Sequence, residues 1–195
     1  MRYSAEHKAQ TREKLLQASG VLAKRGGFAG TGVDGLMKAI GLTGGAFYGH
    51  FSSKDELFAA IVERELSHSL ELLGSGEASR DKLRRCLAMY LSMKHVEQPD
   101  SGCAIPTLGA EIARADIGVR ENAENWLVRL QQAWAAELGD PQLAWAILAQ
   151  CVGALVVARM MATPERQGEV LEASKALIAV SVPAHDENYS QSSKK

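Results

Sequence analysis

The sequence lacks the features of secreted, disulfide-bonded and membrane-spanning proteins. It has only three cysteines, Cys86, Cys103 and Cys151, and their odd number and wide spacing argue against a disulfide framework. The most apolar run, residues 143–158, is interrupted by a glutamine and closed by Arg159, so it is shorter than the about 18 apolar residues of a membrane span. It predicts a buried helix. No apolar stretch follows the first residues, so we expect no secretory signal, no membrane association and a cytoplasmic protein.

Motifs of enzymes and cofactor-binding proteins are also missing. We find no Ser-His-Asp arrangement, metal-ligand spacing, phosphate-binding loop or dinucleotide fingerprint. We therefore expect no enzyme, no cofactor and no metal site. The composition, 46% hydrophobic and 23% charged, is that of a folded globular protein and excludes disordered and fibrous classes.

The charge is unevenly distributed along the chain, although the net charge is only −1. Residues 1–54 contain eight Lys and Arg against three acids, a net charge of +5, which leaves −6 for residues 55–195. A basic N-terminal part indicates contact with a polyanion, although uneven surface charge alone would produce the same count.

Apolar periodicity and capping signals predict an all-α fold and show no strand-like alternation. We expect about nine helices: 6–25, 33–40, 43–50, 55–73, 80–98, a short helix after Pro106, 118–138, 140–161 and 164–182. The expected starts include Thr31 as an N-cap, a capping box from Ser53 to Glu56, and N-cap plus proline pairs at residues 140–141 and 163–164. We expect two domains, at residues 1–54 and 55–183, and a disordered tail at 184–195.

Two short expected helices, 33–40 and 43–50, are joined by a tight turn at Gly41-Leu42, which is the layout of a helix-turn-helix. Glycine suits the left-handed backbone of such a turn. A small apolar core should fix the angle between the helices: Leu15, Leu22, Phe28, Val33, Leu36, Ile40, Leu42, Phe47 and Phe51.

Residues Thr11 to Leu57 resemble the TetR family of bacterial repressors. The match includes Gly41-Leu42-Thr43 and a segment similar to the family's Tyr-x-x-Phe-x-x-Lys hallmark, carried by Tyr48, Phe51 and Lys54. The resemblance implies a three-helix helix-turn-helix domain followed by a helical effector-binding and dimerisation domain, and a homodimer on a double-stranded, pseudo-palindromic operator. The DNA-binding residues that it implies are Thr31, Gly32, Val33, Thr43, Gly44, Gly45, Tyr48, His50 and Lys54.

One departure from the expected pattern concerns the recognition helix. The positions that commonly read bases are Gly44, Gly45 and Gly49, and glycine offers no side-chain donor or acceptor to a base edge. We therefore expect specificity to depend on DNA shape and on an N-terminal arm with Arg2, Tyr3, His7 and Lys8.

The C-terminal part is expected to dimerise through its last two helices and to hold an effector. Apolar side chains of the middle helices are candidates for lining an effector pocket for a small apolar or electrophilic molecule: Met89, Tyr90, Met93, Cys103, Leu108, Trp126 and Trp134. Polar residues that could orient a ligand there are His95, Glu111 and Gln131. Cys103 also has a second interpretation as a thiol sensor, whereas a plain lining or buried thiol is the more common role.

The sequence therefore predicts a DNA-binding transcriptional repressor that is released by a small-molecule inducer or by oxidation. An architectural DNA-binding protein without a ligand is the alternative, and it should show little preference for any one site.

Overall fold

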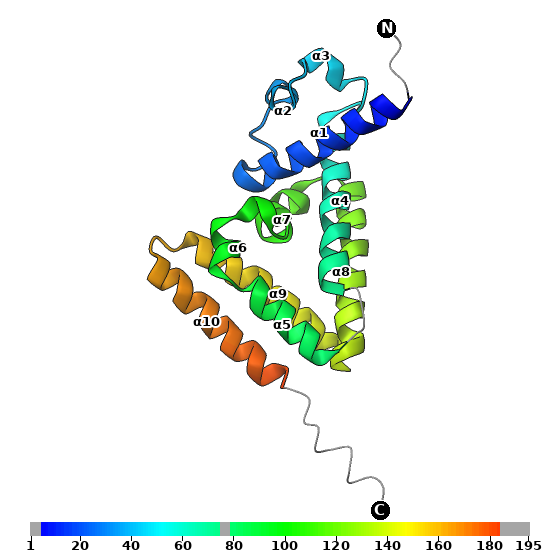
Figure 1. Cartoon of the computed structure of the whole chain (residues 1–195). Coiled ribbons are helices and arrows are strands. Elements are labelled where there is room, and N and C mark those ends of the chain that lie inside the picture. Colours follow the sequence, from blue (N-terminus) through cyan, green and yellow to red (C-terminus); the bar gives the residue numbers. More distant parts are fainter. Residues whose placement is uncertain (1–4, 75–78, 184–195) are drawn as a thin grey trace, which may run out of the picture. The chain divides into compact units, whose positions relative to one another are not determined.

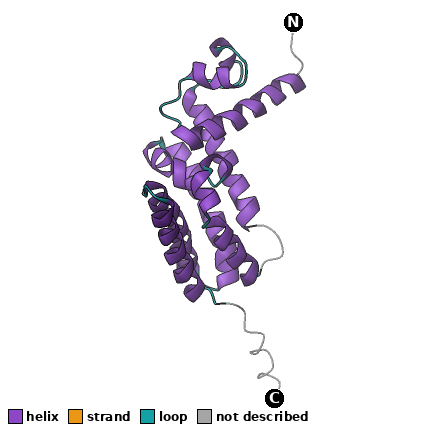
Figure 2. Ribbon diagram, turned by 60° about the vertical axis from the view of Figure 1, so that its left-hand side comes forward, coloured by secondary structure: helices purple, strands orange, loops and turns teal. Residues whose placement is uncertain are grey.

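The computed structural model describes residues 5–74 and 79–183, and every regular element in those ranges is helical (Figures 1 and 2). Ten α-helices and one short 3-10 helix follow one another along the chain: α1 (Ala5–Gly26), α2 (Val33–Ala39), α3 (Gly44–Phe47), α4 (Lys54–Gly74), α5 (Arg80–Tyr90), α6 (Met93–Glu97), η1 (Pro99–Ser101), α7 (Ile105–Arg114), α8 (Ile117–Leu138), α9 (Pro141–Met160) and α10 (Pro164–Ser181). The all-α prediction is confirmed.

The chain divides into two compact units that differ from the expected domains in their bounds. Unit 1 comprises residues 1–72 and 97–129, so α7 and the first half of α8 pack with the N-terminal helices. Unit 2 comprises residues 73–96 and 130–195. The functional division at residue 54 stays a prediction, and the expected disordered tail lies outside the described residues.

The core of unit 1 includes most of the residues expected from the sequence. Leu15, Phe28, Leu36, Phe47 and Phe51 are buried, and Leu22, Val33 and Ile40 pack against them partly buried. Leu42 does not belong to this core, because 37% of its surface is exposed. Met37 of α2, which was not among the expected core residues, is fully buried, and its carbonyl accepts the N–H of Leu42 at 2.9 Å.

Three of the four expected helix starts have the side-chain caps that their sequences indicate. The Oγ of Ser53 accepts the N–H of Glu56, Asp140 accepts two N–H groups at the start of α9, and Thr163 accepts one at the start of α10. The expected cap at Thr31 is wrong. Gly32 is the N-cap residue of α2, and the hydroxyl of Thr31 instead donates back to the carbonyl of Gly27 at 3.3 Å.

The single helix predicted over residues 80–98 is also wrong, because the chain breaks after Tyr90 into α5 and α6. At the break, the hydroxyl of Ser92 accepts the N–H of His95, and the Nδ1 of His95 lies 2.9 Å from the carbonyl oxygen of Tyr90. A serine that caps a new helix competes with continuation of the old one, which apolar periodicity alone does not reveal.

In unit 2, α9 and α10 pack against each other. Helix α9 is long and apolar enough to cross a membrane by composition, but seven of its residues are buried within the chain. Its outward side carries a stripe of exposed apolar residues: Trp145, Val156, Val157 and Met160. Leu177 and Val180 of α10 are exposed as well. Among the small residues of α9, Ala154 and Ala158 are buried inside the chain, whereas a Cβ added at Gly153 would meet nothing within 4 Å.

Candidate nucleic-acid interface

The helix-turn-helix is built from α2, a turn at Gly41 and α3. Gly41 has a φ of +74°, the left-handed conformation that the turn requires and that side chains other than glycine adopt reluctantly. Hydrogen bonds from the N–H groups of Ile40, Gly41 and Leu42 to carbonyls of α2 close the turn. Beneath it, the buried side chain of Phe47 ties α3 to the core of unit 1.

The recognition helix is shorter than predicted, because α3 ends at Phe47 rather than His50. Three glycines lie in this stretch, and each disfavours helix by about 1 kcal/mol relative to alanine. After Phe47 the chain forms turns, in which the N–H groups of Gly49, His50 and Phe51 donate to the carbonyls of Ala46 and Phe47.

The three glycines of this segment have different surroundings. A Cβ at Gly44 would collide with the carboxylate of Asp34, and one at Gly49 would lie 3.3 Å from the carbonyl oxygen of Ala46. A Cβ at Gly45 would meet nothing. The carboxylate of Asp34 is the end of an exposed, flexible side chain that can move aside, so only Gly49, which faces a backbone atom, is restricted by packing.

Two polar side chains around α3 face solvent. Thr43 is the N-cap residue of α3 but makes no capping hydrogen bond through its side chain, and it is exposed. Tyr48 is 68% exposed and contacts the ring of Phe47 edge-on. At the start of α2, Gly32 is exposed, and Thr31 and Val33 are half-buried. These positions leave Thr43 and Tyr48 available to a partner.

His50 lies in a positively charged environment formed with the N-terminal half of α1. Its partial burial and the nearby charges of Lys8, Arg12 and His7 hold the pKa of His50 below its ordinary value of 6.5. The Nδ1 of His50 is buried without a hydrogen-bond partner among the described residues, and the guanidinium of Arg12 lies 4.5 Å from the centroid of the Phe51 ring. The cations around His50 suit an anionic partner. Arg2 and Tyr3 of the expected arm lie outside the described residues.

Lys54, the first residue of α4, is already engaged within the chain. Its Nζ donates to the carbonyl of Ala29 at 2.9 Å and lies 4.8 Å from the centroid of the Phe28 ring. Lys54 therefore joins α4 to the turn before α2. In the first turn of α4, the carboxylate of Glu56 accepts hydrogen bonds from the N–H and the hydroxyl of Ser52, and these bonds lower the pKa of Glu56.

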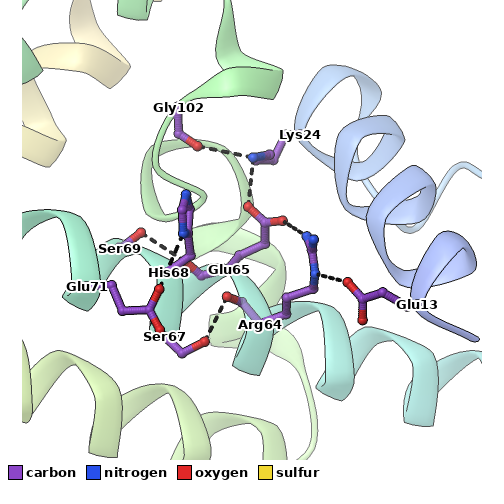
Figure 3. Close-up of polar contacts among 9 residues, drawn as sticks. All are labelled: Glu13, Lys24, Arg64, Glu65, Ser67, His68, Ser69, Glu71 and Gly102. Carbon is purple, nitrogen blue, oxygen red and sulfur yellow. Dashed lines mark hydrogen bonds and ion pairs between the residues drawn. The ribbon is translucent and has the colours of Figure 1, made fainter. Parts of the chain in front are cut away.

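A buried ion pair fixes α1 against α4 (Figure 3). The Nζ of Lys24 lies 2.7 Å from the Oε2 of Glu65, with both side chains more than nine-tenths buried, and it also donates to the carbonyl of Gly102 at 3.2 Å. Arg64 extends the network, since it contacts the Oε1 of Glu65 at 3.3 Å and the carboxylate of Glu13 at 3.1 Å. Sequence periodicity missed this contact, because a lysine near the end of α1 reads as an exposed residue.

The residues expected to line an effector pocket are divided between the two units. Cys103, Leu108 and Trp126 belong to unit 1, where Leu108 is fully buried. The other four, Met89, Tyr90, Met93 and Trp134, belong to unit 2. There Met89 is 73% exposed and Trp134 is buried.

A groove of about 430 Å³ lies within unit 2, and none of the seven expected pocket residues lines it. Its walls come from α5 and α10: Asp81, Arg84, Arg85, Leu87, Ala88, Leu91, Lys175, Ile178 and Ala179. The expected pocket stays a prediction. The groove was missed because its lining alternates charged and apolar residues on two helices far apart in sequence.

Together, the all-helical fold and the turn at Gly41 define a helix-turn-helix protein, the class that places a short helix against duplex DNA. The family profile described as "Bacterial regulatory proteins, tetR family" matches residues 15–61, so the segment that holds the helix-turn-helix is similar to the DNA-binding part of that family.

Relatives and solved structures extend the similarity beyond this segment. The HTH-type transcriptional repressor NemR of Escherichia coli strain K12 is 33% identical over 117 residues, 57% of this chain and 58% of that relative. The chain thus aligns with somewhat more than half the length of this curated relative. The crystal structure of reduced E. coli NemR covers 85% of this chain and 96% of its own, with 26% identity and a TM-score of 0.66. A TetR-family regulator from Cytophaga hutchinsonii shares the fold over 92% of this chain, with 20% identity and a TM-score of 0.69.

Proposed function

We propose that the chain is a transcriptional repressor that binds a pseudo-palindromic operator as a homodimer and is released by a small signal. The observation that carries this proposal is the surface around α3, where exposed Thr43 and Tyr48 lie on the same helix-turn-helix as His50, whose pKa is lowered by partial burial and by neighbouring cations. Thr43 and Tyr48 can donate to phosphates, and the cations supply the salt-dependent part of the affinity.

Dimerisation is supported by the exposed apolar stripe of α9 together with Leu177 and Val180 of α10. An apolar surface of this kind, rimmed by polar residues, is typical of a protein–protein contact. A second copy of the chain would cover it and would present two helix-turn-helix units to two half-sites about 34–36 Å apart.

The test is selection of duplexes from a random pool by the purified full chain, followed by measurement of affinity for the selected duplex. A repressor should prefer that duplex by about 10³-fold or more over a scrambled one. The variant Tyr48→Ala/His50→Ala/Lys54→Ala should lose about 100-fold in affinity, because two phosphate contacts and the bond from Lys54 that holds the turn before α2, about 1 kcal/mol each, are removed. The matched control is Arg120→Ala, which removes one exposed cation from α8 and should bind as the parent does.

Weak binding of all duplexes by the parent, with a steep salt dependence, would favour the architectural alternative. If the triple variant binds with the affinity of the parent, α3 and the start of α4 are not part of the interface. Either result contradicts the proposal.

The signal is proposed to reach the protein through Cys103 or through a bound small molecule. Cys103 is half-buried in the segment between η1 and α7, and its Sγ lies 3.6 Å from the hydroxyl oxygen of Ser69. The residue before it, Gly102, accepts the hydrogen bond from Lys24, so an adduct on Cys103 would disturb the attachment of α1. Hydrogen peroxide should therefore lower operator affinity in the parent but not in Cys103→Ser. An equal response of both proteins would exclude this thiol as the sensor.

A further inference from the structure

The turn between α1 and α2 is held by a carboxylate that comes from α7. Both carboxylate oxygens of Glu111 accept the N–H of Phe28, at 3.0 and 3.1 Å, and one of them also accepts the N–H of Ala29 at 3.0 Å. Hydrogen bonds to a charged group are about twice as strong as neutral ones. The sequence suggested Glu111 as a ligand-orienting group, but its acceptors are directed at the backbone of this turn.

Gly27 gives independent support for the close approach of this carboxylate. A Cβ at Gly27 would lie 2.8 Å from the Oε1 of Glu111, a distance that side chains do not adopt. Gly27 also has a φ of +81°, where other residues are strained. The glycine thus ends α1 and leaves room for Glu111 at the same time.

The same turn is fixed from α4. Lys54 donates to the carbonyl of Ala29, so the N–H and the carbonyl of this one residue are bound by opposite charges from α7 and α4. The ring of Phe28 stacks on that of Phe58 at a centroid distance of 4.8 Å. Only three residues separate Ala29 from Val33, where α2 begins, so the position of the turn sets the start of the helix-turn-helix.

Two further contacts join the segment before α7 to the end of α1. Arg25 forms an ion pair with Asp100 and lowers the pKa of that carboxyl group, while Lys24 donates to the carbonyl of Gly102. Segment 97–114 therefore contacts α1 and the following turn at three points.

We propose that Glu111 is a positioning residue through which α7 sets the geometry of the helix-turn-helix, so that displacement of α7 lowers the affinity for DNA. The proposal rests on the proposed function, because it names the element that regulates the same interface. A signal acts by this route when it favours a conformation in which the bonds from Glu111 to the turn are lost.

The experiment compares Glu111→Gln with the matched control Glu124→Gln, which makes the same charge change on the exposed side of α8. The two readouts are amide hydrogen exchange of the full chain and affinity for the selected duplex, both measured well below the unfolding temperature. In Glu111→Gln, the amides of Phe28 and Ala29 should exchange about tenfold faster, and operator affinity should fall about fivefold. The control should leave both unchanged.

A second variant keeps the experiment decisive if the glutamine destabilises the fold. Glu111→Asp retains the charge but withdraws the carboxylate by one methylene group, and it should change both readouts in the same direction. Faster exchange across all of unit 1, rather than at Phe28 and Ala29, would mean a purely structural role and would overturn the proposal. The proposal would also be overturned if the folded Glu111 variants exchange faster at Phe28 and Ala29 but still bind the operator with parental affinity.

Failure of the proposed function is distinguishable from failure of this inference. If the parent prefers no duplex, the proposed function is contradicted, whereas exchange at Phe28 and Ala29 still reports on the Glu111 contact. If the parent prefers a duplex and Glu111→Gln exchanges and binds as the parent does, only the inference is overturned.

Discussion

The two units of this chain are stabilised in different ways. In unit 1, charged side chains bridge elements far apart in sequence: Lys24 with Glu65, Arg25 with Asp100, and Glu111 with the turn at Phe28. In unit 2, Arg80 and Arg159 donate to backbone carbonyls of distant elements. The contact between α9 and α10 is largely apolar, and part of the apolar surface of both helices is left exposed. Polar contacts have strict geometry and are lost entirely when an element shifts, whereas apolar contacts tolerate sliding. The difference suits the proposed roles of the two units, a signal response in unit 1 and dimerisation in unit 2.

The comparison predicts that unit 1 is sensitive to loss of one buried charge. Lys24→Ala leaves Glu65 buried without its main partner, and this should lower the free energy of unfolding by about 3 kcal/mol. The value lies at the lower end of the usual range because Arg64 still contacts Glu65. Denaturant unfolding measures the change.

Two further variants separate the buried pair from surface pairs. Arg166→Ala removes a partner of the exposed pair with Glu169 and should cost less than about 1 kcal/mol. The apolar replacement Lys24→Met/Glu65→Leu should recover at least half of the loss. If Lys24→Ala and Arg166→Ala lower the free energy of unfolding equally, the buried pair contributes no more than an exposed pair. The proposed difference between the units would then be wrong.

Unit 2 should instead be sensitive to a charge placed on its exposed apolar stripe. In Val156→Glu, two carboxylates would enter the proposed interface near its two-fold axis, and the dissociation constant of the dimer should rise about 30-fold, or about 2 kcal/mol. Sedimentation equilibrium measures this constant. Ile117→Glu is the control, since Ile117 is an exposed apolar residue of α8 in unit 1 and its replacement should leave the dimer intact. Dimers of parental strength in Val156→Glu would place the interface elsewhere.

The sequence predicted the parts of the fold that depend on local chemistry. Gly41 was recognised as a turn position, and it adopts a positive φ. Asp140 and Thr163 were recognised as caps because a short polar side chain directly before a proline is typical of a helix start. Each accepts an N–H two or three residues further along the chain. Features set by partners distant in sequence were missed or assigned wrongly. The role of Lys24 depends on Glu65, and the role of Glu111 depends on the turn at Phe28.

The smallest expected effect concerns His50, the one group at the candidate interface whose pKa is lowered by burial and by neighbouring cations. In the free protein the lowered pKa makes the folded state bind fewer protons than the unfolded state, so His50 contributes stability above pH 6.5 that declines as the pH falls below it. A phosphate beside the ring would raise the pKa again, and DNA binding would then take up a proton. Operator affinity should therefore rise severalfold as the pH falls from about 8 to about 6.

His50→Gln should flatten this profile, while His68→Gln, which changes an exposed histidine of α4, should keep it. A pH profile that is the same in the parent and in His50→Gln would mean that His50 does not meet the DNA, and the basic surface would then act through Lys8 and Arg12 alone.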